Sequence, residues 1–200
     1  MTAPGARVAL VGFTGTGKTT IATRLLHELR CDSRQALLIK LSAPLYRLQQ
    51  IYYTEAGVEL TPATQDQELM AEIAARLRRI SSDALLEQFL AALAAVPPDT
   101  AIVNDDLRVP DPDAAGLLSA GFCVIRLECP DNIRYARLAG RRDQSIIDEP
   151  AVFGPAMSQI PTELVLNTHT ATPAETVQCI LDHLRRKNAT VKEVTRGACS

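Results

Sequence analysis

Short apolar runs alternate along the chain with longer segments in which apolar residues recur at helical spacing. The runs have the length of buried strands, and the longer segments have the period of amphipathic helices. Strands are predicted at residues 8–11, 36–41, 100–104, 122–127 and 164–166, and helices at residues 18–29, from 42–44 onward, and at 112–120, 130–139 and 173–186. This alternation predicts an α/β fold: a five-stranded parallel sheet covered by helices on both faces, with the active site at the carboxyl ends of the strands.

Three segments depart from this alternation. Residues 65–95 are rich in Ala, Leu, Glu and Arg at helical spacing, with a predicted N-cap at 81–83, so we expect a helical insertion over about residues 43–96. Residues 145–160 have no clear period, and the last dozen residues are expected to form a frayed tail. No repeat or linker divides the pattern, which predicts a single domain over residues 1–200.

The composition fits a folded domain. The chain has 200 residues, of which 46% are hydrophobic and 22% charged, enough for one sizeable core. Its longest apolar stretches, such as residues 89–96, are much shorter than the roughly 18–20 residues that a membrane span needs. Residues 1–7 lack the basic, apolar and small-residue pattern of a secretory signal. We therefore expect a cytoplasmic protein with no membrane association, either a monomer or a homodimer.

The net charge and the distribution of cysteines limit which partners and cofactors are expected. The formal net charge of −2 argues against a broad electrostatic footprint for duplex nucleic acid. Local clusters of arginine can still bind phosphate groups. The five cysteines are widely spread and form no Cys-x-x-Cys pair, so the sequence predicts neither a zinc site nor a disulfide framework.

A glycine-rich motif lies between the first predicted strand and the first predicted helix. Residues 12–19 read Gly-Phe-Thr-Gly-Thr-Gly-Lys-Thr, a complete match to the G-x-x-x-x-G-K-[ST] phosphate-binding loop. The composition predicts on the order of 0.001 chance matches in a chain of this length. The glycines let successive backbone N–H groups face the phosphates of ATP, and the following helix adds the positive end of its dipole. The residues expected to bind ATP here are Gly12, Thr14, Gly15, Thr16, Gly17, Lys18, Thr19 and Thr20.

The motif also implies a magnesium site. Lys18 is expected to reach the β- and γ-phosphates as a catalytic cation, and the Thr19 hydroxyl to bind Mg²⁺. A further oxygen ligand is needed at the end of a neighbouring strand, and Asp105 and Asp106 follow the predicted strand at 100–104. We favour Asp105 as the metal ligand, and one of the two acids would also act as a base if the acceptor is a hydroxyl. Capping of the next segment is the alternative role for this pair.

Four arginines are candidate catalytic groups. Arg108 lies just beyond the acidic pair, where it could hold an acceptor phosphate bidentately. Arg137, Arg141 and Arg142 cluster at the end of a predicted helix and the start of a predicted lid over about residues 140–160. Because phosphoryl transfer relies on positioning and on neutralising charge on the transferred group, arginines are expected there. The alternative is that a helix C-terminus simply favours cations.

The acceptor pocket is predicted beside the second strand. Lys40, Ser42, Tyr46 and Arg47 lie where this strand passes into the next helix. A solvated helix face explains Arg47 equally well. The three histidines are scattered, and we assign them no catalytic role.

These motifs resemble those of the P-loop nucleoside monophosphate kinases, in particular the bacteriophage-type deoxynucleoside monophosphate kinases. Residues 41–45, Leu-Ser-Ala-Pro-Leu, look like the family's Phe-Ala-Asp-Pro-Leu segment, and residues 103–108 look like its strand ending in Asp-Val-Arg. The resemblance implies acceptor-side helices over residues 67–93 and an arginine-bearing lid, and it places Asn167 and Thr168 beside the donor base. The sequence departs from the family at Ala43, where the family has Asp, and at Tyr46, where it has a basic residue, and Phe89 is the candidate for an aromatic position in the second insertion helix.

The acceptor therefore remains open among several classes. A nucleoside or deoxynucleoside monophosphate, natural or modified, is the leading candidate for a small-molecule partner. Phosphomevalonate kinases of the phosphate-loop type share a similar Asp-x-Arg strand, and a further relative phosphorylates hydroxymethylated bases in DNA. A regulatory GTPase is a different class, but neither Asp105 nor Asp106 begins an Asp-x-x-Gly motif, and residues 167–170 are not the Asn-Lys-x-Asp that binds guanine. A degenerate kinase that serves only as a scaffold would have to retain an intact phosphate loop without turnover.

Overall fold

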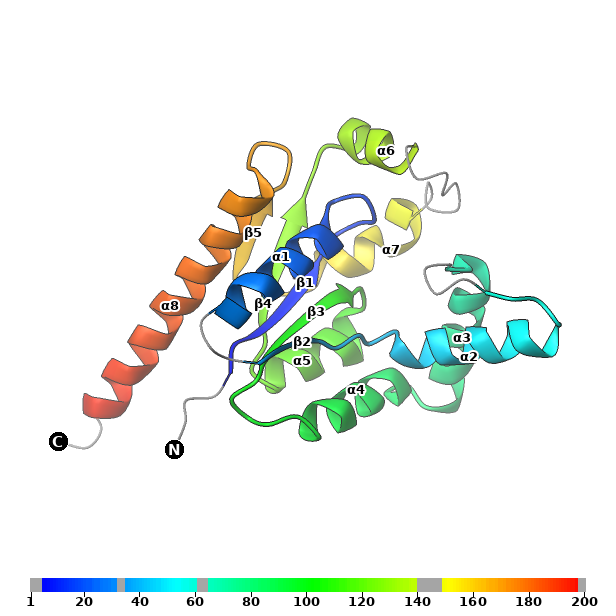
Figure 1. Cartoon of the computed structure of the whole chain (residues 1–200), viewed down its shortest axis with the longest axis horizontal. Coiled ribbons are helices and arrows are strands. Elements are labelled where there is room, and N and C mark those ends of the chain that lie inside the picture. The colour runs from blue at the N-terminus through cyan, green and yellow to red at the C-terminus, as the bar shows by residue number, and fades with distance from the viewer. Residues whose placement is uncertain (1–4, 32–34, 61–64, 140–148, 198–200) are drawn as a thin grey trace.

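The computed structural model describes residues 5–31, 35–60, 65–139 and 149–197 (Figure 1). Five strands form one sheet in the order β2-β3-β1-β4-β5, and every neighbouring pair is parallel. The predicted five-stranded parallel sheet is thus confirmed. The strands are β1 (Arg7–Val11), β2 (Ala36–Leu38), β3 (Ala101–Leu107), β4 (Cys123–Glu128) and β5 (Leu164–Asn167).

Helices cover both faces of the sheet. They are α1 (Lys18–Cys31), α2 (Ala43–Glu55), α3 (Gln67–Ile80), α4 (Ala84–Ala94), α5 (Ala115–Ser119) after a helical turn at Pro110–Ala114, α6 (Asp131–Ala139), α7 (Glu149–Ser158) and α8 (Pro173–Gly197). Helices α1 and α8 lie side by side over one face, and α4, α5 and α7 lie over the other. Among the described residues, none of the helices has both the length and the apolar character required to cross a membrane.

The two faces have separate cores because side chains alternate along each strand. In β1, Val8 and Leu10 pack against α1 and α8, whereas Ala9 and Val11 pack against α4, α5 and α7. All four are fully buried, so the strand reads as a continuous apolar run. This central strand therefore delivers the following glycine-rich loop to a fixed place between the ends of β3 and β4.

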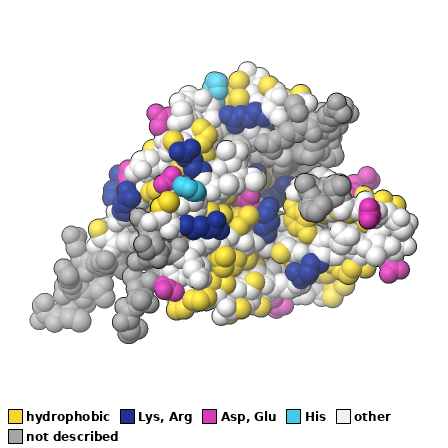
Figure 2. All heavy atoms as spheres, viewed as in Figure 1, with side chains coloured by type: hydrophobic (Ala, Val, Ile, Leu, Met, Phe, Trp, Pro, Cys, Tyr) yellow, Lys and Arg dark blue, Asp and Glu magenta, His cyan; other side chains and the backbone are white. Residues whose placement is uncertain are grey.

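The segment expected to be a helical insertion contains α2, α3 and α4. These helices share a small core of their own, formed by Leu45, Met70, Ile73 and Leu85. Asp66 caps α3 by accepting a hydrogen bond from the backbone N–H of Leu69 at 3.0 Å. Helices α2 and α3 extend away from the sheet, and the surface is hollowed between them and the body that carries the sheet (Figure 2).

Two sequence expectations were wrong in detail, and one segment without a predicted element is helical. Strand β3 continues through the acidic pair to Leu107 instead of ending before it. Residues 149–158, for which no element was predicted, form α7, which lies against Phe13 of the phosphate loop at Gly154 and enters the core through Met157. Helix α8 reaches Gly197, since no Pro or Gly interrupts residues 187–196, so most of the expected frayed tail is helical.

Candidate active site

The glycine-rich loop is tightly packed against its surroundings. Gly15 and Gly17 have φ values of +90° and +94°, a conformation that favours glycine. A Cβ atom on Gly15 would lie only 2.7 Å from Cγ of Arg134, and one on Gly12 would lie 2.4 Å from the carbonyl oxygen of Leu127. The close approach of neighbouring chain segments therefore requires glycine at two positions of the motif.

Lys18 lies inside the curve of this loop. Its ammonium group donates to the carbonyl oxygens of Gly12, at 2.5 Å, and of Phe13, at 3.0 Å, and the residue is 9% exposed. The Thr16 hydroxyl donates to the same Phe13 carbonyl at 2.7 Å. The loop thus holds a positive charge within a curl of backbone at the N-terminus of α1, an arrangement suited to polyphosphate.

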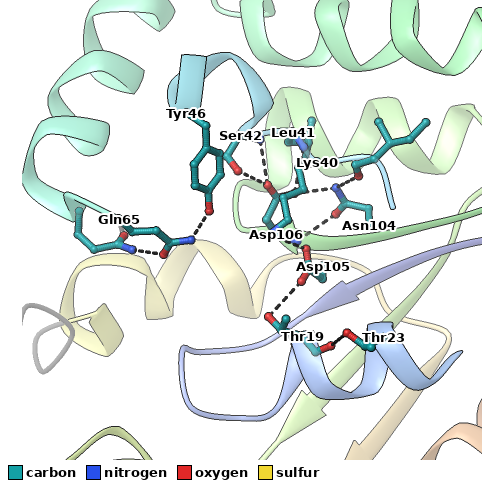
Figure 3. Close-up of polar contacts among 12 residues, drawn as sticks. Thr19, Thr23, Lys40, Leu41, Ser42, Tyr46, Gln65, Asn104, Asp105 and Asp106 are labelled. Atoms are coloured by element: carbon teal, nitrogen blue, oxygen red, sulfur yellow. Dashed lines mark hydrogen bonds and ion pairs between the residues drawn. The ribbon is translucent and has the colours of Figure 1, made fainter. Parts of the chain in front are cut away.

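Asp105 lies opposite the first turn of α1 and faces two groups of the site (Figure 3). Its Oδ2 accepts a hydrogen bond from the Thr19 hydroxyl at 3.1 Å. Its Oδ1 lies 3.3 Å from the ammonium nitrogen of Lys40, and the carboxylate side chain is only 1% exposed. No well-aligned donor among the described residues reaches Oδ1. A buried carboxylate with one incompletely satisfied oxygen is a good candidate for binding a metal cation.

The oxygens of Thr19 and Asp105 fit the requirements of magnesium. Mg–O bonds of about 2.0–2.1 Å place neighbouring oxygens of an octahedron about 2.9 Å apart. The observed separation of 3.1 Å is close to that value. Mg²⁺ usually takes one or two protein oxygens and completes its shell with water and substrate phosphates. The pair can therefore hold the ion.

Lys40 is held in its charged form by its neighbours. Partial burial alone would lower its pKa, but Asp105, Tyr46 and Asp106 together raise that pKa above its usual value. The ammonium also lies 5.8 Å from the centre of the Tyr46 ring. Lys40 therefore stays protonated through the physiological range and brings a fixed positive charge to the site.

Asp106 has a different environment from Asp105. Its two oxygens accept hydrogen bonds from the backbone N–H groups of Leu41 and Ser42, from the Ser42 hydroxyl and from the Asn104 side chain, at 2.5–3.0 Å (Figure 3). These contacts fix the turn between β2 and α2. Ser42, expected in the acceptor pocket, thus uses its hydroxyl to bind Asp106.

Replacing Asp106 by Asn is expected to destabilise the fold. An amide offers a single acceptor oxygen and turns a donor toward N–H groups that already donate, at a cost of about 2–3 kcal/mol. In a domain of this size that lowers Tm by about 4–12 °C. Thermal unfolding of D106N beside D99N, which alters an exposed aspartate, measures the difference. Equal Tm values for the two variants would contradict the structural role of Asp106.

The expected acceptor residues are not all brought together. Tyr46 lies beside Lys40, and its hydroxyl accepts a hydrogen bond from the Gln65 side chain. Burial raises the pKa of Tyr46, Lys40 opposes that rise, and the charge of Arg108 also reaches the phenol. Arg47 is exposed and donates to Gln88 at 2.5 Å, linking α2 to α4 away from this cluster.

Arg137 joins the phosphate loop to the loop after β5. Its guanidinium donates to the carbonyl oxygen of Gly15 at 3.2 Å and to that of Thr168 at 2.9 Å. The Thr168 hydroxyl in turn donates to the carbonyl oxygen of Thr16 at 2.7 Å. Asn167 stabilises its own loop by accepting from the backbone N–H of His169 at 2.8 Å. Arg141 and Arg142 lie outside the described residues.

The sequence analysis missed Arg134, which lies directly behind the phosphate loop. This arginine is fully buried, its Nη1 donates to the Thr14 carbonyl at 3.3 Å, and its Nε pairs with Asp131 at 3.1 Å. Its guanidinium lies 5.6 Å from the centre of the Phe13 ring and 4.5 Å from that of Tyr135. Its position four residues before the buried Leu138, on the inner face of α6, was the available signal.

The fold and the loop together define a class of protein. A phosphate-binding loop after the central strand of a parallel sheet ordered β2-β3-β1-β4-β5 is the fold of the P-loop kinases. Among solved structures, the shikimate kinase from Acinetobacter baumannii in complex with shikimate is 16% identical with a TM-score of 0.55, covering 92% of this chain and 94% of that one.

Other solved structures give the same result. A sugar kinase from Janibacter sp. is 16% identical with a TM-score of 0.52, covering 90% of this chain and 94% of that one. The shikimate kinase from Aquifex aeolicus is 15% identical with a TM-score of 0.52, covering 92% and 98%. At such identities the likeness shows the fold alone. No protein-family profile and no curated protein sequence matches the chain.

Proposed function

We propose that the protein is an ATP- and Mg²⁺-dependent phosphotransferase that moves the γ-phosphoryl group onto a small phosphorylated acceptor, best a nucleoside or deoxynucleoside monophosphate. The observation that carries this proposal is the contact of Thr19 with Asp105, beside Lys18 and Lys40, at the carboxyl ends of β1 and β3. This contact brings together three features: the phosphate loop, a pair of oxygens suited to Mg²⁺, and a second positive charge from Lys40.

Each residue of the site has a separate role in the proposed reaction. Lys18 and the backbone N–H groups of residues 12–19 would bind the phosphates of ATP, and Thr19 and Asp105 would hold Mg²⁺, which neutralises phosphate charge when bound. Lys40 lies on the side of Asp105 that faces α2, where an acceptor would enter from the hollow beside α2 and α3 (Figure 2). Arg108 adds a guanidinium at the same end of β3, which suits an anionic acceptor.

The monophosphate acceptor rests on two arguments. An ionised phosphate needs no general base, and histidine takes no part in the described cluster. The turn at Leu41–Leu45 and strand β3 with Arg108 just beyond its end are the segments whose residues resemble the monophosphate kinases, and Asp106 fixes them against each other. The departures at Ala43 and Tyr46 fall on this same acceptor side, so the acceptor base is expected to differ from that of the typical family member.

A hydroxylated acceptor is the second candidate. Oδ1 of Asp105 is buried, and its hydrogen-bonding capacity is not fully used by the described residues, so it could take a proton from an attacking hydroxyl. The similar solved structures are named as kinases of shikimate and of a sugar. A hydroxylated metabolite, or a hydroxymethylated base in DNA, is the corresponding acceptor.

The test is an ADP-release assay with Mg-ATP and a panel of acceptors. The panel holds ribo- and deoxynucleoside monophosphates, modified monophosphates, hydroxylated metabolites, and oligonucleotides with hydroxymethylated bases, with the K18M variant as the blank. We expect acceptor-dependent release with a monophosphate. Release only with a hydroxyl acceptor would favour the second candidate, and ATP binding with release on no acceptor would contradict both.

A further inference from the structure

A cluster of metal-ligating side chains lies at the end of the sheet opposite the phosphate loop. Cys123 is the first residue of β4, whereas the loop packs against Leu127 near the other end of that strand. Glu163 immediately precedes β5, and its backbone N–H donates to the Val124 carbonyl at 2.8 Å. His183 comes from α8. Three elements that are distant in sequence thus meet at one point, which is why cysteine spacing gave no sign of it.

The distances suit a shared ligand. The Cys123 sulfur, a carboxylate oxygen of Glu163 and a ring nitrogen of His183 all lie within 4.8 Å of one another. The His183 Nε2 and Glu163 Oε2 atoms are 3.3 Å apart. Zinc bonds of about 2.0–2.3 Å place neighbouring ligand atoms of a tetrahedron about 3.3–3.7 Å apart. Small side-chain movements would therefore bring all three atoms to bonding distance of one ion.

The donor set selects the kind of ion. Thiolate, imidazole and carboxylate together are ligands for Zn²⁺ and similar transition metals, whereas Mg²⁺ and Ca²⁺ take oxygen. Lys187 binds the other carboxylate oxygen, Oε1 of Glu163, at 2.6 Å and so orients that ligand from outside. The side chains of Glu163 and His183 are 31% and 22% exposed, which leaves a path for the ion and a position for water.

The thiol is protonated in the absence of metal. Burial and the charge of Glu163 raise the pKa of Cys123 to about 12, and the thiol shares a hydrogen bond with that carboxylate. A bound metal cation favours the thiolate over the thiol, because a coordinating thiol loses its proton outright. Binding therefore replaces one S–H bond by a metal–sulfur bond and releases one proton to solvent.

We propose that Cys123, Glu163 and His183 form a site for a divalent transition metal, best Zn²⁺, that ties α8 to the sheet. The site is independent of the proposed phosphoryl transfer, since it lies at the other end of β4. The competing interpretation is a metal-free network in which Lys187 and His183 simply neutralise Glu163.

The experiment titrates the metal-stripped protein with Co²⁺ and then with Zn²⁺. We expect one Co²⁺ per chain, with a thiolate-to-cobalt charge-transfer band that Zn²⁺ abolishes. At a hundredfold excess over Kd, Zn²⁺ is expected to raise Tm by about 5–10 °C. Neither readout depends on kinase activity, so failure here leaves the proposed function standing.

Matched variants identify the ligands. C123S should lose the charge-transfer band, whereas C179S, which alters an exposed cysteine of α8, should keep it. H183Q should weaken Co²⁺ binding at least tenfold, and H27Q on α1 should not. H183Q alters a partly exposed side chain, so it keeps the test valid if C123S fails to fold. Absence of the band, its loss in C179S, or its persistence in C123S would overturn the proposal.

Discussion

Replacement of Lys18 by Met is expected to lower acceptor-dependent ADP release by about 10³-fold or more. The substitution keeps most of the apolar stem and removes the charge that lies within the curve of the phosphate loop. That charge neutralises the β- and γ-phosphates where negative charge builds up during transfer, so its loss should act mainly on kcat. The measurement is steady-state turnover of K18M with saturating Mg-ATP.

The control for this prediction removes a positive charge from the same helix. Arg24 is exposed on α1, and R24M should retain turnover within a few-fold of the wild type. Because Lys18 also bonds to the carbonyls of Gly12 and Phe13, thermal unfolding of K18M must show that the variant is folded. A folded K18M with near wild-type turnover would rule out the proposed chemistry.

The sheet could be predicted because its central strands are short continuous runs of apolar residues. Apart from Arg7 in β1 and from Arg126 and Glu128 in β4, these two strands are apolar on both faces, so their runs stand out even without alternation. Helix α7 could not be predicted in this way. Its Gly154 lies close to Phe13 on the loop, and Met157 of the helix enters the core together with Ile160 just beyond the helix end, so no single apolar stripe develops. Tertiary contacts, rather than periodicity, define that helix.

The acidic pair shows where sequence reasoning about the site stops. Alternation predicts that Asp105 and Asp106 point to opposite sides, but it does not say which one faces the phosphate loop. In the pairing of β1 with β3, Ala9 is opposite Asn104 and Val11 is opposite Leu107. Between these two pairs β1 has one residue, whereas β3 has two, Asp105 and Asp106. Such a bulge re-aims side chains next to it, and sequence alone does not locate it.

The partners of buried charged residues could not be predicted from the sequence either. Arg134 and the Lys40–Asp105 pair lie where a charge would be costly without partners, and those partners come from segments far apart in the chain. A single sequence shows which side chains carry charge but not which ones meet. The phosphate loop is the exception because the residues expected to bind phosphate are consecutive in the sequence. Each of them could therefore be named from the sequence alone.

Replacement of Asp105 by Asn is expected to lower turnover by about 10²–10³-fold and to raise the Mg²⁺ concentration needed for half-maximal activity. The amide keeps the size of the side chain but removes the negative charge opposite Thr19 that would hold the ion. It also leaves Lys40 without the carboxylate 3.3 Å away, so the cation beside the acceptor is no longer fixed. The measurement is a Mg²⁺ titration of turnover at saturating ATP and acceptor.

Comparison with two other aspartate variants makes this result specific. D106N should lose Tm because Asp106 holds the turn before α2, and D99N should change neither property. D105N is expected to stay folded, because the bond from Thr19 can still be accepted by the amide oxygen. If excess Mg²⁺ restores turnover of D105N, its carboxylate acts through the metal. If turnover stays low at every Mg²⁺ concentration, the carboxylate also serves as a base, and the acceptor is then a hydroxyl rather than a phosphate. Wild-type turnover and Mg²⁺ dependence in D105N would remove Asp105 from the site altogether.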